Sequence, residues 1–260
     1  MNRHVDYDQV APTYDGRYQR GGYSGTEQAL LRFIGEQAPL QVLEAGCGTG
    51  HWLGIARAHG QRVIGLDFSA QMLSKARAAL PGIELIHGRA ESLPLPAESF
   101  DRIFCINAFH HFVDKPAFLA EARRLLRPGG GLFSVGLDPH DGTGQWYVYD
   151  YFKESLEIDQ ERFPPTSQLR ECLRNAGFAN CVTHEVDHWF LQLPAREILA
   201  QGRLEKAATS QLTVLTDEEY LQGMQSLEED VQRAERKGET LLLTADLCLY
   251  GTYGSVPDKK

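Results

Sequence analysis

The stretch Val42-Leu43-Glu44-Ala45-Gly46-Cys47-Gly48-Thr49-Gly50 decides the fold of this chain. A short apolar run leads into three alternating glycines, and a helical pattern begins directly afterwards at His51. This order predicts a strand, a tight turn and a helix start, the place where an α/β sheet binds a nucleotide-like ligand. Glycine suits the turn because it adopts positive φ and lets a ligand approach the backbone closely. The backbone N–H groups of the following helix then point at whatever occupies the loop.

The spacing and charge of this loop argue against a dinucleotide as its ligand. A dinucleotide fingerprint requires a third small residue three positions after its second glycine, but those positions hold His51 or Leu53. Glu44 also places a negative charge beside the expected position of a pyrophosphate, and like charges in a partly desolvated cleft repel strongly. S-adenosylmethionine (SAM) carries a sulfonium and an α-ammonium group and no phosphate. The loop therefore favours SAM and disfavours an NAD-dependent oxidoreductase.

A second acidic residue follows at the end of the next predicted strand, Arg62–Asp67. Asp67 lies at roughly the 20-residue offset where an acid accepts hydrogen bonds from a ribose in such folds. At this point the sequence resembles the class I SAM-dependent methyltransferases, in the small-molecule (type 11) branch related to the quinone C-methyltransferases. Two later segments add to the resemblance. Gly88–Pro94 is similar to the family's Gly-Asp-Ala-Glu-x-Leu-Pro segment, and Leu126–Gly130 is similar to its Leu-Arg-Pro-Gly-Gly turn.

The resemblance implies SAM as the cofactor and methyl transfer by in-line displacement as the reaction. It also implies that Glu44 balances the ammonium group, that Asp67 holds the ribose, and that Phe68 and Met72 flank the adenine ring. The residues expected to bind the cofactor are Tyr14, Arg17, Glu44, Gly46, Gly48, Thr49, Gly50, Asp67, Phe68, Met72, Arg89, Ala90, Glu91, Ile106 and Asn107.

At Arg89 the sequence departs from the family pattern. The family has an acid there, whose carboxylate usually accepts the adenine amino group, whereas a guanidinium is a donor. The backbones of Arg89 and Ala90 remain expected contacts of the ring, and a guanidinium can also stack on a base. Glu91 is expected either to accept from the adenine amine or to cap the next turn.

The segment Ser99–Ile106 reads as the fourth strand, and its carboxyl end should face the ligand crevice. Ile106 and Asn107 are therefore expected beside the methionine part of SAM. His110 and His111 are candidate catalytic bases, because a histidine can take a proton at neutral pH. The alternative is a structural or adenosine-contacting role. Adjacent histidines point in different directions, so no metal site is expected here.

The first 23 residues are rich in tyrosine and glycine and show weak helical periodicity. In the resembled family such a segment folds over the cofactor as a lid. A sulfonium is attracted to electron-rich ring faces, so Tyr14 or Tyr18 is expected to hold the methyl end of SAM. Arg17 is expected among the cofactor contacts, and Tyr18 among the substrate contacts. The alternative is that these tyrosines only pack a terminal arm on the core.

Aromatic residues crowd the stretch that follows the fifth predicted strand, Leu132–Leu137. In this architecture that location faces the substrate, and aromatic rings suit an apolar or planar acceptor. Trp146 and Tyr147 are therefore the candidate substrate-binding residues. The alternative is that they pack an ordinary loop helix.

The chain has 260 residues and a formal net charge of −9, with a pI of about 5.5. This acidity argues against extended contacts with nucleic acid, because neutralising phosphates requires a basic face. Five cysteines without a Cys-x-x-Cys spacing are typical of a reduced, cytoplasmic protein, and we expect no membrane insertion. The expected partner is a small-molecule methyl acceptor. A tRNA or protein methyltransferase and a non-catalytic SAM-binding module remain the alternatives.

The predicted fold is α/β: a Rossmann-like, seven-stranded class I methyltransferase sheet with helices on both faces and a helical cap inserted before the last strand. We expect one domain over residues 1–260, divided into an N-terminal lid (1–23), a SAM-binding core (24–187), the cap (188–239) and the last strand with its tail (240–260). The cap is expected to cover the pocket or to form a homodimer contact. Capping boxes are predicted at Ser24–Glu27 and Thr216–Glu219.

Overall fold

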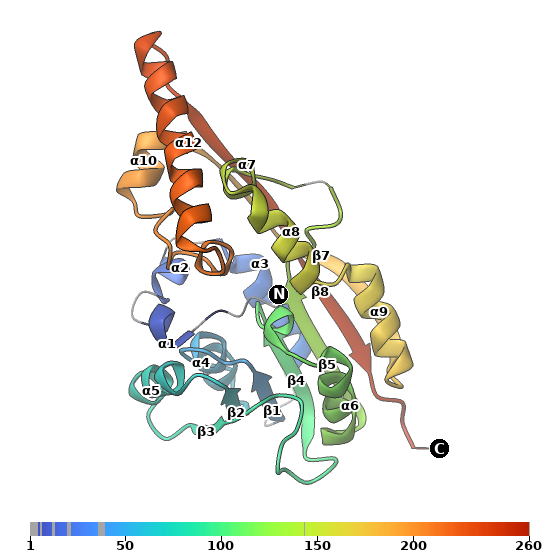
Figure 1. Ribbon diagram of the computed structural model, residues 1–260. Coiled ribbons are helices and arrows are strands. Elements are labelled where there is room, and N and C mark those ends of the chain that lie inside the picture. The colour runs from blue at the N-terminus through green and yellow to red at the C-terminus, as the bar shows by residue number, and fades with distance from the viewer. Residues whose placement is uncertain are drawn as a thin grey trace.

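The computed structural model describes residues 5, 7–11, 14–19, 22–35, 40–142 and 144–259, apart from the side chains of residues 9, 17 and 19. Its centre is one mixed sheet with the strand order β3-β2-β1-β4-β5-β8-β6, and β7 also pairs with β8 (Figure 1). The first five strands are mutually parallel, whereas β8 runs antiparallel to β5, β6 and β7. The strands are β1 (Gln41–Ala45), β2 (Arg62–Asp67), β3 (Glu84–His87), β4 (Phe100–Ile106), β5 (Leu126–Gly136), β6 (Gln145–Trp146), β7 (Ala179–Pro194) and β8 (Leu242–Ser255).

Helices cover both faces of this sheet because its parallel strands are apolar on both sides. In β4, Ile103 and Cys105 face the core formed with α6 and α9, whereas Phe104 and Ile106 face the core formed with α3, α4 and α5. The helices are α1 (Tyr7–Val10), α2 (Gly16–Gln19), α3 (Ser24–Ile34), α4 (His51–Ala58), α5 (Ala70–Ala79), the 3₁₀ helix η2 (Phe109–His111), α6 (Lys115–Leu125), α7 (Tyr147–Tyr151), α8 (Lys153–Arg162), α9 (Thr166–Asn175), α10 (Ala195–Ala200), α11 (Ser210–Thr213) and α12 (Asp217–Arg236).

The Rossmann-like α/β sheet with helices on both faces is confirmed, and the strands differ from the prediction in three respects. The fifth predicted strand was expected to begin at Leu132, but β5 already begins at Leu126. The two-residue strand β6 adds an eighth strand that the sequence did not predict, since two residues carry no periodic signal. The sixth predicted strand was expected to end at Asp187, but β7 continues to Pro194 because β8 pairs with it along the whole length. Residues 188–194, expected at the start of the helical cap, therefore belong to the sheet.

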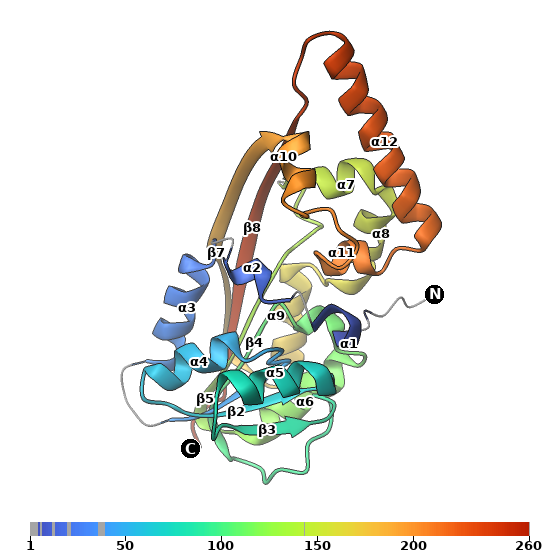
Figure 2. The same cartoon turned by 90° about the vertical axis from the view of Figure 1, so that its left-hand side faces the viewer.

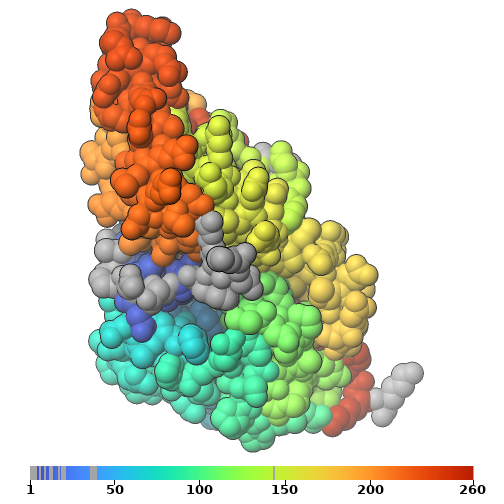
Figure 3. All heavy atoms as spheres, in the orientation of Figure 1, coloured from blue at the N-terminus to red at the C-terminus, as the bar shows by residue number. Residues whose placement is uncertain are grey.

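A third apolar core lies at one end of the molecule, where α7, α10 and α12 pack against the far ends of β7 and β8 (Figures 1 and 2). Trp146, Ile198, Leu227 and Leu243 are among its buried residues. Figure 3 shows this helical part as a projection beyond the sheet-based core. The predicted capping box at Thr216 is present at the start of α12. Within the described ranges, no helix combines the length and the apolarity needed to cross a membrane.

The N-terminus of α3 is held by a residue of β7 rather than by its own side chains. The predicted capping box at Ser24–Glu27 is wrong, because the helix already begins at Ser24 and no local side chain caps it. Instead, Asp187 accepts hydrogen bonds from the Thr26 N–H and hydroxyl, both at 2.6 Å, and from the Gly25 N–H at 3.2 Å. A Cβ on Gly25 would lie 1.9 Å from a carbonyl oxygen of β7, so glycine allows this close approach.

We expect Asp187→Ala to lower the free energy of unfolding by about 1–2 kcal/mol, the scale for losing a helix N-cap. Asp187→Asn keeps an acceptor and should lose less. Urea unfolding measures both, with Glu239→Ala as an exposed acidic control. A loss for Asp187→Ala no larger than that of the control would show that α3 does not depend on this carboxylate.

Candidate active site

The loop after β1 turns on three glycines in the left-handed region. Gly46, Gly48 and Gly50 have φ angles of 76°, 52° and 87°. A Cβ at Gly46 would lie 2.5 Å from the Cβ of Ala108, so a larger residue would separate this loop from the segment after β4. Gly50 immediately precedes α4, whose first backbone N–H groups lack partners within the helix. The loop thus has the anion- and dipole-binding geometry that the glycine pattern predicts.

Asp67, the last residue of β2, fastens this loop to the next one. Its carboxylate accepts from the backbone N–H of Gly48 and from that of Ser69, each at 2.8 Å. The Ser69 hydroxyl in turn accepts from the Met72 N–H at 3.1 Å and caps α5. Burial raises the pKa of Asp67, and the backbone donors partly oppose that rise. Asp67 therefore shapes the two loops and also faces the space between them.

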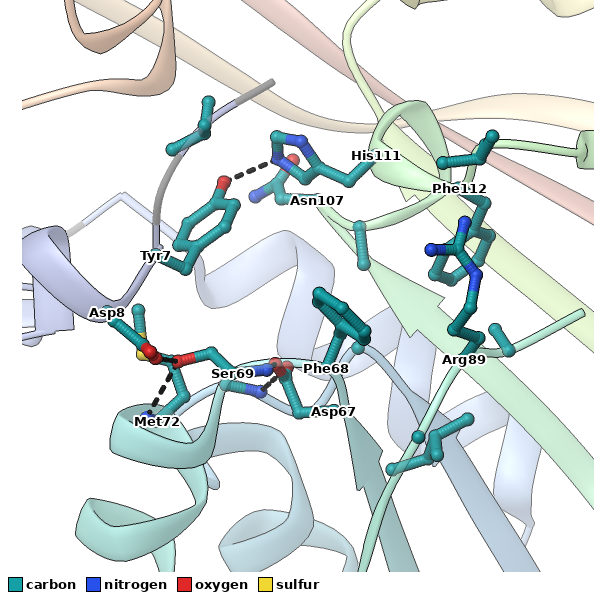
Figure 4. A pocket seen from close by; sticks show the side chains of 18 of the residues that line it. Tyr7, Asp8, Asp67, Phe68, Ser69, Met72, Arg89, Asn107, His111 and Phe112 are labelled. Carbon is teal, nitrogen blue, oxygen red and sulfur yellow. Dashed lines mark hydrogen bonds between the residues drawn. The ribbon is translucent and has the colours of Figure 1, made fainter.

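A cavity of about 460 Å³ lies over these two loops (Figure 4). We refer to it as the first cavity. Its lining consists of Val5, Tyr7, Asp8, Tyr14, Gly46, Gly48, Leu66, Asp67, Phe68, Ser69, Met72, Gly88, Arg89, Ala90, Glu91, Asn107, Ala108, His111, Phe112 and Val113. Ten of the fifteen predicted cofactor residues are in this lining. Those ten are Tyr14, Gly46, Gly48, Asp67, Phe68, Met72, Arg89, Ala90, Glu91 and Asn107.

Four predicted cofactor residues lie behind the cavity wall instead of in it. The Ile106 side chain belongs to the core under α3 and α4, and Gly50 packs beside Leu80 of the α5 region. The Thr49 hydroxyl donates to an oxygen of Asp15 at 2.5 Å, so it fastens the N-terminal segment to the loop. Glu44 is the fourth. Arg17, the fifteenth residue, lies in α2, and its side chain is outside the described residues.

Glu44 is a buried carboxylate directly behind the glycine loop. Its exposed fraction is 1%, and among the described residues its Oε2 has no hydrogen-bond partner. Burial raises the pKa of Glu44 well above its ordinary value, the nearby Asp67 charge adds to the rise, and a backbone N–H from Leu53 opposes it. An unsatisfied buried acceptor fits a ligand that brings a cation or a donor, and it does not fit a pyrophosphate. The residues present therefore fit the ammonium group of SAM.

Phe68 and Arg89 lie on the side of the first cavity where the adenine ring was expected. Phe68 is 67% exposed, although it is a large apolar residue, and the Arg89 guanidinium lies 5.5 Å from its ring centre. Glu91 accepts from the backbone N–H groups of Val113 and Asp114 at 2.8 and 3.3 Å, and it lies 3.6 Å from Arg89. Both Glu91 oxygens are thus engaged by the protein, which favours its alternative role as a structural acceptor. An exposed ring beside a guanidinium remains as a stacking surface for a base.

The N-terminal segment is fastened over the cavity at two points. The Ser69 hydroxyl donates to Asp8 at 2.5 Å, and Asp15 accepts from Thr49 as described above. Between these anchors, the Tyr14 ring would lie 3.6 Å from a Cβ on Gly48, so it covers the glycine loop. Tyr18 is different: its ring stacks on His51 at 3.8 Å and it lines neither cavity. The structure therefore places Tyr18 in packing, not at the substrate.

The two adjacent histidines point into different cavities, as their positions on a tight turn require. His111 lines the first cavity, and its Nε2 is hydrogen-bonded to the Tyr7 hydroxyl (Figure 4). His110 is 8% exposed, stacks on Phe163 at 3.8 Å, and lines a second cavity. Only His111 is therefore close to the cofactor side.

The second cavity has a volume of about 420 Å³ and an aromatic wall. It lies under the helical cap, and its lining includes Trp146 and Tyr147, the two candidate substrate-binding residues. The full lining is Tyr7, Gly22, Tyr23, Asn107, His110, Leu137, Trp146, Tyr147, Phe163, His188, Trp189, Phe190, Leu191, Arg203, Ala208, Thr209, Ser210, Gln211, Ala245, Leu247 and Leu249. Tyr7 and Asn107 line both cavities, so the two spaces share a boundary.

A buried polar network that the sequence analysis missed lies behind His111. Asp159 is fully buried and accepts from the Tyr149 hydroxyl and the Gln211 amide at 2.8 Å each, and from Arg162 at 3.2 Å. Arg162 in turn donates to Nδ1 of His111 at 3.4 Å. These polar residues follow no motif, and helix α8 shows little amphipathic pattern. The sequence offered only one indication of this network, the opposite charges of Asp159 and Arg162 three positions apart in one helix.

Comparison with known proteins identifies the family of this chain. The family profile described as a methyltransferase domain matches residues 43–134, which include both cofactor loops. A demethylmenaquinone methyltransferase of Oceanobacillus iheyensis is 33% identical over 207 residues, which cover 67% of this chain and 86% of that relative. The chain belongs to the SAM-dependent methyltransferases. SAM is accordingly its cofactor.

Two further comparisons delimit the likeness of this methyltransferase to other proteins. A phthiotriol/phenolphthiotriol dimycocerosates methyltransferase of Mycobacterium leprae is 34% identical over 163 residues, but the match spans only 60% of that relative and 61% of this chain. A solved structure assigned as a methyltransferase of an antibiotic biosynthesis pathway in Anabaena variabilis superposes with a TM-score of 0.69 at 21% identity. It covers 89% of this chain and 96% of its own, and it supports the class I fold.

We expect Glu44→Gln to weaken SAM binding about tenfold or more, because the variant loses the buried carboxyl that can ionise to balance the ammonium group. Titration calorimetry with SAM and S-adenosylhomocysteine measures the change. The ligand-free variant should be as stable as the parent or more stable, since it no longer buries an ionisable acid. Equal losses of affinity and stability would show that Glu44 supports the fold and not the ligand.

The raised pKa of Glu44 also predicts a pH dependence. The folded protein keeps a proton that the unfolded chain releases above the ordinary glutamate pKa of 4.5. The contribution of this group to stability should therefore fall as the pH rises from about 4.5 to the folded pKa. Urea unfolding across this window should show that fall in the ligand-free parent and a flatter profile in Glu44→Gln. Identical pH profiles of stability in the parent and in Glu44→Gln would contradict the raised pKa of Glu44.

Proposed function

We propose that this methyltransferase transfers the methyl group of SAM to a small apolar or aromatic molecule that lies in the second cavity. The observation that carries the proposal is the boundary at Tyr7 and Asn107, which line both cavities. Methyl transfer requires the donor and acceptor atoms to be in contact and in line. Two adjoining cavities, one with the cofactor loops and one with aromatic walls, provide for such a contact.

The charge of the first cavity supports its use for a cationic cofactor. Its described lining includes the carboxylates of Asp8, Asp67 and Glu91, against one guanidinium from Arg89. Tyr14 adds an aromatic face, which attracts a sulfonium. When bound, SAM supplies an activated methyl group, and the protein supplies alignment and exclusion of water. The two lid anchors at Asp8 and Asp15 hold the segment that would exclude water.

The shape of the backbone at the boundary supports the same reading. Asn107 has a φ of 52°, although it is not a glycine, and its N–H donates to the Val135 carbonyl at 2.8 Å. A non-glycine residue in this conformation is strained and typically occurs at functional sites. The turn brings the Asn107 side chain to the wall that the two cavities share.

Tyr7 and His111 are the polar pair at this boundary. A guanidinium can only donate, so Nδ1 of His111 must accept from Arg162 and the ring of the neutral histidine carries its proton on Nε2. Nε2–H then donates to the Tyr7 oxygen. We infer that His111 positions Tyr7, and that Tyr7 is the residue that contacts the acceptor.

The names of the relatives support a small-molecule acceptor. One relative is named for demethylmenaquinone and another for phthiotriol and phenolphthiotriol dimycocerosates. The net charge of −9 disfavours the alternative of a tRNA methyltransferase, because extended phosphate contacts need a basic surface.

Two substitutions should separate the cofactor cavity from the acceptor cavity. We expect Phe68→Ala to weaken SAM binding about tenfold, because it removes the exposed stacking face. Trp146→Ala should leave SAM binding unchanged and raise the acceptor KM by about tenfold or more. Calorimetry with SAM measures the first effect, and release of S-adenosylhomocysteine across a panel of phenols, quinols and aromatic acids measures the second.

Two results would contradict the proposed function. Loss of SAM binding in Trp146→Ala would mean that the cap cavity is part of the cofactor site. The small-molecule proposal would be overturned if no member of the panel yielded S-adenosylhomocysteine while a tRNA or protein substrate did.

We expect Tyr7→Phe to lower kcat by about tenfold to a hundredfold and to change SAM affinity by less than about threefold, since it removes one polar contact to the acceptor. Steady-state kinetics and calorimetry measure the two quantities. Tyr23→Phe is a matched control, because Tyr23 lines the second cavity away from the boundary that both cavities share. Equal kcat values for the two variants would remove Tyr7 from the mechanism.

A further inference from the structure

The two cavities differ in their ionisable side chains. Three carboxylates and one guanidinium occur in the described lining of the first cavity. In the second cavity no aspartate, glutamate or lysine occurs in that lining, and its guanidinium belongs to Arg203. This chain has 35 acidic and 26 basic residues, so an acid-free lining of 21 residues is contrary to its overall composition. The charge of the second cavity therefore points to a ligand different from SAM.

Arg203 is half-buried in the turn that follows α10. Its backbone N–H donates to the Ile198 carbonyl at 3.2 Å, which fixes the turn, and its Nε donates to the Gln201 side chain at 2.6 Å. Within the described part of the chain, no carboxylate lies within ion-pairing distance of Arg203. Arg196, seven residues earlier and within α10, pairs with both Glu228 and Glu235. The guanidinium at the cavity thus differs from its surface neighbour.

The positive charge that His188 can carry in this wall is balanced by a neighbouring carboxylate. His188 is exposed, and its Nε2 lies 2.5 Å from a carboxylate oxygen of Asp246. The hydrogen bond to Asp246 raises the pKa of His188, so the two groups form an ion pair of no net charge when His188 is protonated. The positive charge of the second cavity therefore comes from Arg203.

The remaining walls define the rest of the ligand. Aromatic rings from Trp146, Tyr147, Phe163 and Trp189 line the cavity, and the side chains of Thr209, Ser210 and Gln211 add hydroxyl and amide groups near Arg203 in the chain. Flat apolar groups pack favourably on such rings. Arginine matches the planar geometry of a carboxylate with two parallel hydrogen bonds.

We propose that the methyl acceptor is an aromatic acid, whose carboxylate binds Arg203 and whose ring system packs on the aromatic wall of the second cavity. The proposal rests on the proposed function of this cavity as the acceptor site. The cavity volume of about 420 Å³ is within the range of small-molecule sites. An anionic acceptor also complements a cationic methyl donor held in the adjoining cavity.

The test compares two ligands that differ only in charge, 2-naphthoate and 2-naphthamide. Calorimetric titrations use the full chain at pH 7.5 with saturating S-adenosylhomocysteine, so that the first cavity is filled. The variants are Arg203→Gln, Arg203→Lys, Trp146→Ala and the surface control Arg196→Gln. We expect the parent and Arg196→Gln to bind the acid about tenfold or more tightly than the amide. Arg203→Gln should abolish this preference without weakening the amide, and Arg203→Lys should keep part of it.

The other outcomes would reject either the anionic acceptor alone or also the acceptor role of the second cavity. An unchanged preference for the acid in Arg203→Gln, with both ligands weakened by Trp146→Ala, would reject the anionic acceptor and leave the acceptor cavity intact. A parent that binds the amide as tightly as the acid would do the same. Binding of both ligands that is unaffected by Trp146→Ala would reject this proposal and would also count against the acceptor role of the cavity.

Discussion

Both loops of the first cavity depend on the hydrogen bonds that the Asp67 carboxylate accepts. One of its oxygens holds the glycine loop through the Gly48 N–H, and the other holds the next loop through the Ser69 N–H. The Ser69 hydroxyl continues the connection to Asp8 in the N-terminal segment. A single half-buried acid thus links two loops and a segment more than fifty residues earlier in the chain. These loops can share the Asp67 carboxylate as an acceptor because neighbouring parallel strands end at the same edge of the sheet.

The two cavities divide the requirements of the reaction between them. The first provides negative charge for a cationic cofactor, and the second provides aromatic surface and one guanidinium. In the proposed arrangement the carboxylates lie beside the cofactor and Arg203 lies beside the acceptor, so an anionic acceptor would meet no carboxylate in its own cavity. Tyr7 and Asn107 lie where the two environments meet, which is the place where a polar contact can orient the acceptor.

Local patterns predicted the geometry of the two loops of the first cavity, because the residues of these loops follow one another closely in the sequence. The glycine loop, Asp67 and the Ser69 cap each depend on neighbours within a few positions, and short-range spacing carries that information. Prediction failed where the partner was distant. No local pattern could show that Asp187 caps α3 or that Tyr18 stacks on His51, because these contacts depend on the pairing of β7 with β8 and on the path of the N-terminal segment. Those contacts are tertiary, and sequence spacing does not encode them.

The buried network around Asp159 gives the helical cap a connection to the boundary between the cavities. Gln211 lines the second cavity and donates to Asp159, Asp159 holds Arg162, and Arg162 donates to His111. A buried acid with several donors is costly to leave partly satisfied, so displacement of Gln211 would disturb the whole chain of contacts. The position of the cap and the orientation of His111 are therefore physically coupled. An acceptor that packs against Gln211 would in this way act on the same side chains that orient Tyr7.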